Sequence, residues 1–263
     1  MRFQLIELHE QSWFPSTIRD EITDAMQFAL NWIDVYAPAA PIIRNVLDFT
    51  GSRCILDLCS GGGGPWLDLA SEFQLEDRTT GILLTDKYPN LPAPKASKDF
   101  NKAPANIDFY PHPVDAMDIP DDLNGLRTMF SSFHHFPPDN ARAILQNAVD
   151  AGAGICIFEV TRRNALTILL MLPWALVPFL VTPWIRPFRW SRLLWTYIVP
   201  IIPLVLLFDG IVSCLRTYRP HELRRIVDKL RGARYRWEIG EHSGRDNCVT
   251  ISCLAGYPES NAD

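Results

Sequence analysis

The sequence lacks an excess of basic residues, which argues against a nucleic-acid-binding protein. Its 263 residues include 25 Lys and Arg against 30 Asp and Glu, a formal net charge of -5. A domain that follows a phosphate backbone needs a basic face, and nothing in the composition indicates one. The 48% of hydrophobic residues can instead fill the core of one large α/β domain. We therefore predict a single domain and no nucleic-acid partner.

Cysteine is scarce, and its spacing does not indicate a metal or redox centre. None of the six cysteines forms a C-x-x-C pair, and most lie in apolar, strand-like runs. A thiol in such a run behaves as a small hydrophobic group, so we expect reduced, structural cysteines. The first ten residues contain Glu7, His9 and Glu10 where a signal peptide has a basic start and an apolar core. The body of the protein is therefore expected in the cytoplasm.

Glycine is not abundant, yet four of the 14 glycines stand together at 61–64. An apolar run over 55–58 precedes them, and an amphipathic stretch begins at Trp66, with Pro65 suited to a first helical turn. The pattern predicts a strand, a turn open to a ligand and a helix. Four glycines can also form a plain flexible loop, but that alternative does not explain the flanking segments. The third glycine of the dinucleotide fingerprint is absent because Trp66 stands in its place, which disfavours a pyrophosphate ligand.

This segment resembles motif I of the class I methyltransferases that use S-adenosylmethionine. In that motif an acidic residue is followed, two positions on, by Gly-x-Gly-x-Gly. Asp57, Cys59, Gly61 and Gly63 occupy those places, and Cys59 is a small-for-small replacement of the first glycine. The resemblance implies S-adenosylmethionine as the cofactor and places these four residues in its binding site. It indicates no particular member of the family.

Further acidic residues follow at the intervals that this fold requires. Asp86 ends an apolar run 23 residues beyond Gly63, and the resemblance implies that it accepts hydrogen bonds from the ribose hydroxyls. An Asp-Ala pair after the next strand, Asp115 with Ala116, is implied to contact the adenine amino group, with Asp118 as the second choice. Either acid can instead be a helix cap or a solvated loop residue. The full predicted cofactor set is Asp57, Cys59, Gly61, Gly63, Asp86, Lys87, Asp115, Ala116 and Ser131.

Seven segments separated by helical stretches predict the whole sheet. The candidate strands cover residues 55–58, 81–85, 106–110, 126–133, 154–160, 235–241 and 247–257. We expect an α/β fold with a doubly wound, mostly parallel seven-stranded sheet that closes on an antiparallel C-terminal hairpin. Along the chain we expect an N-terminal helical segment (1–50), a cofactor-binding half (51–160), an apolar helical insertion between strands five and six (164–214), and a closing helix and strands (215–263). Within the first segment we expect a helix over 16–36, capped by Ser16.

Most of the insertion lacks acidic residues. No Asp or Glu occurs from 160 to 208, and two uncharged apolar stretches cover 165–185 and 193–208. The first is long enough to span a bilayer and the second is too short. Their connector contains Arg186, Arg189 and Arg192, which a translocated loop should avoid. We expect a proline-broken helical hairpin that enters one leaflet with these arginines against anionic headgroups; a soluble lid or a dimer contact is the alternative.

Catalytic candidates stand where the fourth and fifth strands end. The resemblance places the methyl acceptor there, and imidazole titrates near neutrality, so His134 and His135 are candidate bases. Adjacent histidines leaving a strand should point differently, so only one should face the acceptor. Glu159 is the third candidate, although it can equally fix its loop against Arg162 or Arg163. No metal is expected, because neither an H-x-x-x-H pattern nor a nearby cysteine supplies further ligands.

These observations predict methyl transfer from S-adenosylmethionine to a small-molecule or lipid-like, hydrophobic acceptor. The expected location is the cytoplasmic face of a membrane, with a soluble cytoplasmic enzyme as the alternative. A non-catalytic, membrane-associated binding protein of the same fold is the rival function. A nicotinamide-dependent reductase is disfavoured by Trp66. The sequence leaves open the acceptor, the atom methylated and the oligomeric state.

Overall fold

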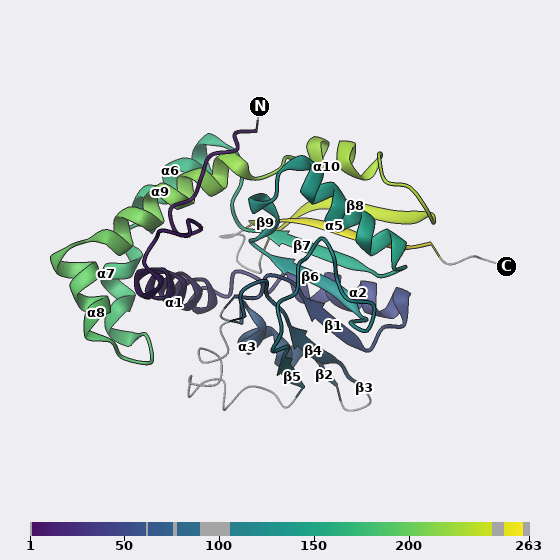
Figure 1. Cartoon of the computed structure of the whole chain (residues 1–263), viewed down its shortest axis with the longest axis horizontal. Helices are drawn as coiled ribbons and strands as arrows, with labels where there is room; N and C mark the ends of the chain where they lie inside the picture. Colours follow the sequence, from purple (N-terminus) through teal and green to yellow (C-terminus); the bar gives the residue numbers. More distant parts are fainter. Residues whose placement is uncertain (1, 62, 76–77, 90–105, 244–249, 260–263) are drawn as a thin grey trace.

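A seven-stranded sheet forms the centre of the computed structural model, which describes residues 2–61, 63–75, 78–89, 106–243 and 250–259 (Figure 1). The strands are β1 (Cys54–Asp57), β4 (Gly81–Leu84), β5 (Ile107–Phe109), β6 (Leu126–Phe130), β7 (Ile155–Glu159), β8 (Tyr235–Ser243) and β9 (Thr250–Pro258). Their order in the sheet is β5-β4-β1-β6-β7-β9-β8. The first five in that order are parallel, and β9 is antiparallel to both β7 and β8. The predicted fold class is confirmed. A separate two-stranded sheet, β2 (Gln74–Leu75) with β3 (Arg78–Thr79), was not expected.

The strand order places β1 at a topological switch. The chain runs from β1 outward to β4 and β5, then returns to the other side of β1 to form β6 and β7. Asp57, the last residue of β1, therefore lies between Leu84 of β4 and Thr128 of β6. Ligands of open α/β sheets bind beyond the carboxyl ends of the strands at such a point.

Helices cover both faces of the sheet (Figure 1). They are α1 (Ser16–Trp32), α2 (Ala39–Thr50), α3 (Trp66–Leu69), α5 (Pro138–Asp150), α6 (Ala165–Trp174), α7 (Val177–Val181), α8 (Trp190–Leu193), α9 (Ile201–Arg216) and α10 (Pro220–Val227). Successive side chains of a strand point to opposite faces, so Ile55 joins the core beneath α2, and Leu56 joins the core beneath α5 and α10. Burial on both faces explains why the β1 sequence is continuously apolar before Asp57.

Two predicted helices differ from those observed. The helix after the glycine turn is only α3 followed by a 3₁₀ turn, because Trp66 is fully buried with its ring against Phe130 and anchors the segment to the sheet. Helix α1 ends at Trp32 rather than at residue 36, since Asp34 adopts a left-handed φ of 47° that no α-helix can continue. The N-cap of α1 is Pro15 and not Ser16, and no side chain caps it.

The insertion and the N-terminal helix form one lobe beside the sheet (Figure 1). Helix α6 runs against α9, and α1 packs against α7 and α9. Ile18 and Ile22 of α1 share an apolar core with Ile202 of α9 and with α7. Asn164 begins the insertion as the N-cap of α6, where its side chain accepts a hydrogen bond from the Thr167 amide. Deleting the insertion would uncover the apolar face of α1, so its function is better tested by surface substitutions.

Candidate functional site

The glycine turn after β1 has the backbone conformation that glycine permits. Gly61 and Gly63 adopt φ values of 54° and 112°, which L side chains rarely adopt. A Cβ built at Gly61 would meet no atom of the described residues within 4 Å, so the space beside the turn is open. Cys59 also has a positive φ, 58°. The motif that this segment resembles has glycine at this position. Here the cysteine side chain strains the backbone.

Asp57 supports this turn from inside the protein. Its carboxylate accepts hydrogen bonds from the Ser60 and Thr128 hydroxyls, both at 2.6 Å, and the residue is 1% exposed. Its backbone oxygen accepts the Thr85 amide at 2.9 Å. Burial raises the pKa of Asp57 to about 6, although the two hydroxyls oppose the shift. Asp57 thus positions the turn that the predicted cofactor would contact.

Asp86 meets the glycine turn directly. Its Oδ2 accepts the Gly61 amide at 2.9 Å, and its Oδ1 accepts the Tyr88 amide at 2.8 Å. Lys87, beside it, forms an ion pair with Asp115, with Nζ 2.7 Å from Oδ2. Four of the predicted cofactor residues, Gly61, Asp86, Lys87 and Asp115, thus meet where β1, β4 and the chain after β5 end. Each carboxylate retains lone pairs for a hydroxyl or amine ligand.

The remaining predicted cofactor residues follow β5 and β6. Ala116 is buried beside Asp115, and the Asp118 amide donates to the Asp115 carbonyl at 3.0 Å. Ser131 follows β6 with a left-handed φ of 42°, and its hydroxyl accepts a 2.7 Å hydrogen bond from Tyr36. Tyr36 is 5% exposed and comes from the segment after α1. The N-terminal region is thereby fixed to the strand ends.

Both histidines face one point because they lie in a 3₁₀ turn, Phe133–His135, and not on a strand. Their ring centroids are 4.2 Å apart, so the expectation that they point differently is wrong. His134 Nδ1 lies 2.7 Å from Glu159 Oε2, and the His134 amide donates to Glu159 Oε1 at 3.0 Å. The suggested partners of Glu159 pair elsewhere, Arg162 with Glu241 and Arg163 with Glu222. Glu159 therefore orients His134.

The N-terminal segment supplies acidic residues that the sequence did not connect to the site. Glu7 is fully buried; its Oε1 lies 3.7 Å from His134 Nε2, and its Oε2 lies 3.5 Å from His135 Nδ1. Glu10 Oε1 lies 2.5 Å from His135 Nδ1, and Glu10 Oε2 accepts from Arg216 at 2.8 Å. Burial raises the pKa of Glu7, with His135 and Arg216 opposing the shift. A separation of 127 residues from His134 hides this contact from any local pattern.

Main-chain contacts hold this segment in place. The amides of Leu8 and His9 donate to the Asp209 carboxylate at 2.7 and 3.1 Å. Arg2 donates to the carbonyl oxygens of His134 and Phe136 at 2.7 and 3.0 Å. The result is a closed polar cluster beyond the ends of β6 and β7, at the same sheet edge as the glycine turn. Its imidazole nitrogens can accept a proton or bind a cation.

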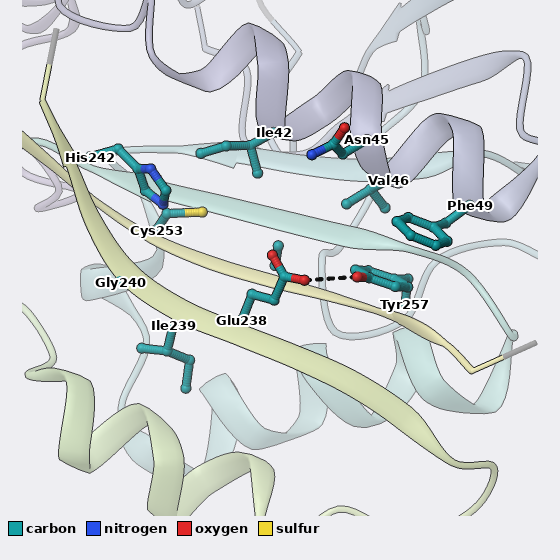
Figure 2. Close-up of a pocket in the computed structure, with 11 residues that line it drawn as sticks. Ile42, Asn45, Val46, Phe49, Glu238, Ile239, Gly240, His242, Cys253 and Tyr257 are labelled. Carbon is teal, nitrogen blue, oxygen red and sulfur yellow. Dashed lines mark hydrogen bonds between the residues drawn. The ribbon is translucent and has the colours of Figure 1, made fainter.

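A groove elsewhere shares none of the predicted site residues. It has a volume of about 210 Å³ and lies between α2 and the outer strands β8 and β9 (Figure 2). Phe49 and Val46 of α2 face Cys253 and Tyr257 across it, and Tyr257 donates to Glu238 at 2.8 Å. It is formed because α2 does not cover the sheet edge completely.

Comparison with known proteins identifies the fold. No protein-family profile matches the sequence, and no curated protein matches it. Human N-acetylserotonin methyltransferase, solved in complex with S-adenosylmethionine, matches with a TM-score of 0.53 and 13% identity over 95% of this chain and 60% of that one. An O-methyltransferase from neocarzinostatin biosynthesis, solved with S-adenosylmethionine and 2-hydroxy-5-methyl naphthoic acid, has a TM-score of 0.52 and 10% identity over 92% of this chain and 57% of that one.

A third structure, an O-methyltransferase family protein from Burkholderia thailandensis, matches with a TM-score of 0.50 and 14% identity over 92% of this chain and 60% of that one. The chain thus spans about 60% of the length of these structures. At such identities the likeness concerns the fold. This chain shares its fold with these three methyltransferase structures.

Proposed function

We propose that this chain transfers a methyl group from S-adenosylmethionine to a hydrophobic acceptor at a membrane surface. The observation that carries the proposal is the contact between Asp86 and Gly61 at the switch point of a sheet with the class I strand order. It joins the carboxylate expected at the ribose to the turn expected to approach the ligand. The two solved relatives named with S-adenosylmethionine support the same choice of cofactor.

The residues at this edge fit that cofactor. No atom of the described residues occupies the space beside Gly61, and the carboxylates of Asp86 and Asp115 offer acceptors for hydroxyl and amino groups. Asp86 would hold the ribose hydroxyls, Asp115 the adenine amino group, and the glycine turn the remainder of the molecule. When bound, S-adenosylmethionine supplies a methyl group on a sulfonium that is already activated. The chain must then hold the acceptor in line and exclude water.

The acceptor side of the proposed site is the polar cluster around His134. Glu159 fixes the orientation of the His134 ring, and Glu7 closes the cluster from the N-terminal segment. These buried groups exclude water and offer a polar contact to the atom that receives the methyl group. Tyr36 and Ser131 connect this side to the end of β6, beside the glycine turn.

An exposed apolar stripe supports the membrane location. Leu166, Leu169, Leu176 and Leu180 are 63%, 61%, 59% and 68% exposed, and their spacing places them along one side of α6 and α7. Further exposed large apolar side chains of the lobe are Leu170, Leu172, Trp184, Trp190, Ile198, Leu204 and Phe208. A soluble monomer rarely exposes a contiguous apolar patch of this kind. A hairpin that lies flat along one leaflet would bury it.

The length of the helices allows more than one membrane arrangement. Ala165–Trp184 is long and apolar enough to cross a membrane, and only 28% of its most apolar window is buried. Trp190–Ile198 and Ile201–Arg216 together form a second such segment, bent by 72°. Arg186, in the connector between these segments, is exposed. A positively charged loop is not readily moved across a membrane, so the two segments are better placed at the membrane interface than across the bilayer.

The role expected for Arg192 at the membrane is wrong. Its side chain is 1% exposed, forms an ion pair with Asp24 of α1 and donates to the Pro187 carbonyl at 3.1 Å. It is a buried contact between the insertion and α1. Arg186 and Arg189 are the two arginines of the connector that can reach headgroups.

Calorimetric titration with S-adenosylmethionine tests the cofactor assignment. Wild type should bind it and should not bind a nicotinamide dinucleotide. Asp86→Asn should weaken binding by roughly 10- to 100-fold, because a charge-assisted contact to the hydroxyls is lost. Asn keeps an oxygen that can accept one of the two amides, so the turn should persist. Unchanged affinity in this variant would remove Asp86 from the site.

A non-catalytic binding protein of the same fold is the second candidate. Binding measurements cannot separate it from an enzyme, because both would take up the cofactor. Transfer of a labelled methyl group into a lipid extract does separate them, since only the enzyme would leave label in the organic phase.

A further inference from the structure

We propose that Glu7, His134 and His135 form a binding site for a divalent transition-metal ion of the zinc class. Each residue offers one ligand atom, and these atoms lie within 4.8 Å of one another. Among the described residues, Glu7 Oε2 and His134 Nε2 are buried without a hydrogen-bond partner, and the buried His135 Nδ1 lies 2.5 Å from Glu10 Oε1 and 3.5 Å from Glu7 Oε2. Leaving such ligand atoms unsatisfied costs free energy in a folded protein, and a shared cation would satisfy all three.

The surroundings of His134 are those of a metal ligand. Its Nδ1 is held by Glu159 Oε2 at 2.7 Å, and its amide by Glu159 Oε1 at 3.0 Å. The ring is therefore fixed with Nε2 toward Glu7, 3.7 Å from Oε1. A carboxylate on the far nitrogen sets the tautomer of a ligating histidine and raises its basicity. Glu159 is thus a positioning residue for the site.

The charges around the site favour a cation. Glu7, Glu10, Glu159 and Asp209 lie within or beside the cluster. Arg216 pairs with Glu7 and Glu10, whereas Arg2 donates to the carbonyl oxygen of His134. The carboxylates outnumber the guanidinium groups, so neutral imidazoles leave an excess of negative charge. Arg216 lies 3.3 Å from Glu7 Oε1 and leaves Oε2 free.

Glu10 determines how His135 would take part. Its Oε1 lies 2.5 Å from His135 Nδ1 but outside hydrogen-bond geometry. On metal binding, Nδ1 would exchange this contact for the ion, and Glu10 would stay on Arg216, which holds its other oxygen at 2.8 Å.

The ligand set decides the class of metal. Two imidazoles and one carboxylate suit Zn²⁺, Co²⁺ or Fe²⁺, whereas Mg²⁺ and Ca²⁺ prefer oxygen ligands alone. Three protein ligands leave a fourth position for water or for an oxygen atom of the acceptor. Only this last point rests on the proposed methyl transfer. With a metal bound, His134 Nε2 is a ligand and no longer a proton acceptor.

Metal titration of the whole chain tests the site without cofactor or acceptor. Protein treated with a chelator and then dialysed is titrated with Zn²⁺ by calorimetry and with Co²⁺ by visible absorption. We expect one equivalent of either ion, a Co²⁺ spectrum of low coordination number, and a higher urea midpoint in the presence of Zn²⁺. Glu7→Gln and His134→Gln should each weaken binding at least 100-fold, and Glu159→Gln roughly 10- to 100-fold.

His221→Gln is the matched control, because His221 is exposed on α10 outside the cluster. It should leave affinity and stoichiometry unchanged. Far-ultraviolet circular dichroism and urea unfolding without metal confirm that each variant is folded; Glu7→Gln preserves shape if His134→Gln does not fold. Absence of stoichiometric binding by wild type, or unchanged affinity in Glu7→Gln, overturns the proposal. Because no methyl donor is present, a failure of methyl transfer does not affect this result.

Discussion

The exposed stripe on α6 and α7 gives a quantitative test of membrane binding. The perturbation is the fourfold variant Leu166→Gln, Leu169→Gln, Leu176→Gln and Leu180→Gln. All four side chains are about 60% exposed, so their replacement should leave the fold intact. None of them belongs to the apolar core that the lobe shares with α1.

The magnitude follows from the exposed fraction. Burying a whole leucine side chain contributes about 1.5–3 kcal/mol, so the exposed part of each contributes about 1–2 kcal/mol on entering a membrane interface. Four together contribute about 4–8 kcal/mol. Because about 1.4 kcal/mol is a factor of ten, the variant should bind vesicles at least roughly 700-fold more weakly than wild type.

Vesicle cosedimentation measures this difference, with neutral and anionic vesicles compared at fixed salt. Phe49→Gln is the matched control, since Phe49 is also 63% exposed but lies on α2, away from the lobe. It should bind vesicles as wild type does. A fourfold variant with wild-type vesicle affinity, or a wild-type protein that ignores vesicles, would refute the membrane assignment and leave a soluble lid or a dimer contact as the role of the stripe.

Three further predictions concern charge and backbone. Arg192→Gln should lower the free energy of unfolding by about 3 kcal/mol, because it leaves Asp24 without its partner. Arg186→Gln should leave urea unfolding unchanged and should weaken binding to anionic vesicles by about 1 kcal/mol. Cys59→Val should destabilise the protein by about 1–2 kcal/mol while Cys59→Gly should not, since φ is 58° there; equal urea midpoints for the two variants would contradict the backbone account. The pKa of Asp57 is raised to about 6 in the folded protein, so its stabilising contribution is present below about pH 4, the unfolded pKa, and is lost as pH rises to 6. Asp57→Asn should therefore gain up to about 3 kcal/mol relative to wild type between pH 4 and pH 7, and a difference that does not vary with pH would show that Asp57 is not desolvated.

The sheet and the contacts at the glycine turn could be predicted because their signals are local. An apolar run ending in Asp57, a glycine turn and an acid at position 86 specify a strand, a sharp turn and a neighbouring strand within residues 55–86. The contact of Asp86 with Gly61 follows once β4 is placed beside β1, and that of Lys87 with Asp115 once β5 is placed beside β4. The short helix after the turn was missed because the burial of Trp66 depends on Phe130, which is distant in the sequence.

The polar cluster around His134 could not be predicted because its contacts join distant segments. Glu7 approaches His134 and His135 only because the N-terminal segment is held by Asp209 of α9 and by Arg216. No local pattern in the sequence connects the acidic residues at 7 and 10 with these histidines. The position of Arg192 was mistaken for a similar reason. Its partner, Asp24, lies 168 residues away on α1.

Transfer of a labelled methyl group tests the central claim most directly. The protein is incubated with S-adenosylmethionine labelled in its methyl group and with a membrane lipid extract, and the organic phase is counted. The account predicts label that depends on time and enzyme, that falls at least tenfold at subsaturating cofactor in Asp86→Asn, and that is unaffected by Phe49→Gln. Wild-type protein that binds S-adenosylmethionine and the membrane but leaves no label in the organic phase would contradict methyl transfer to a lipid-like acceptor.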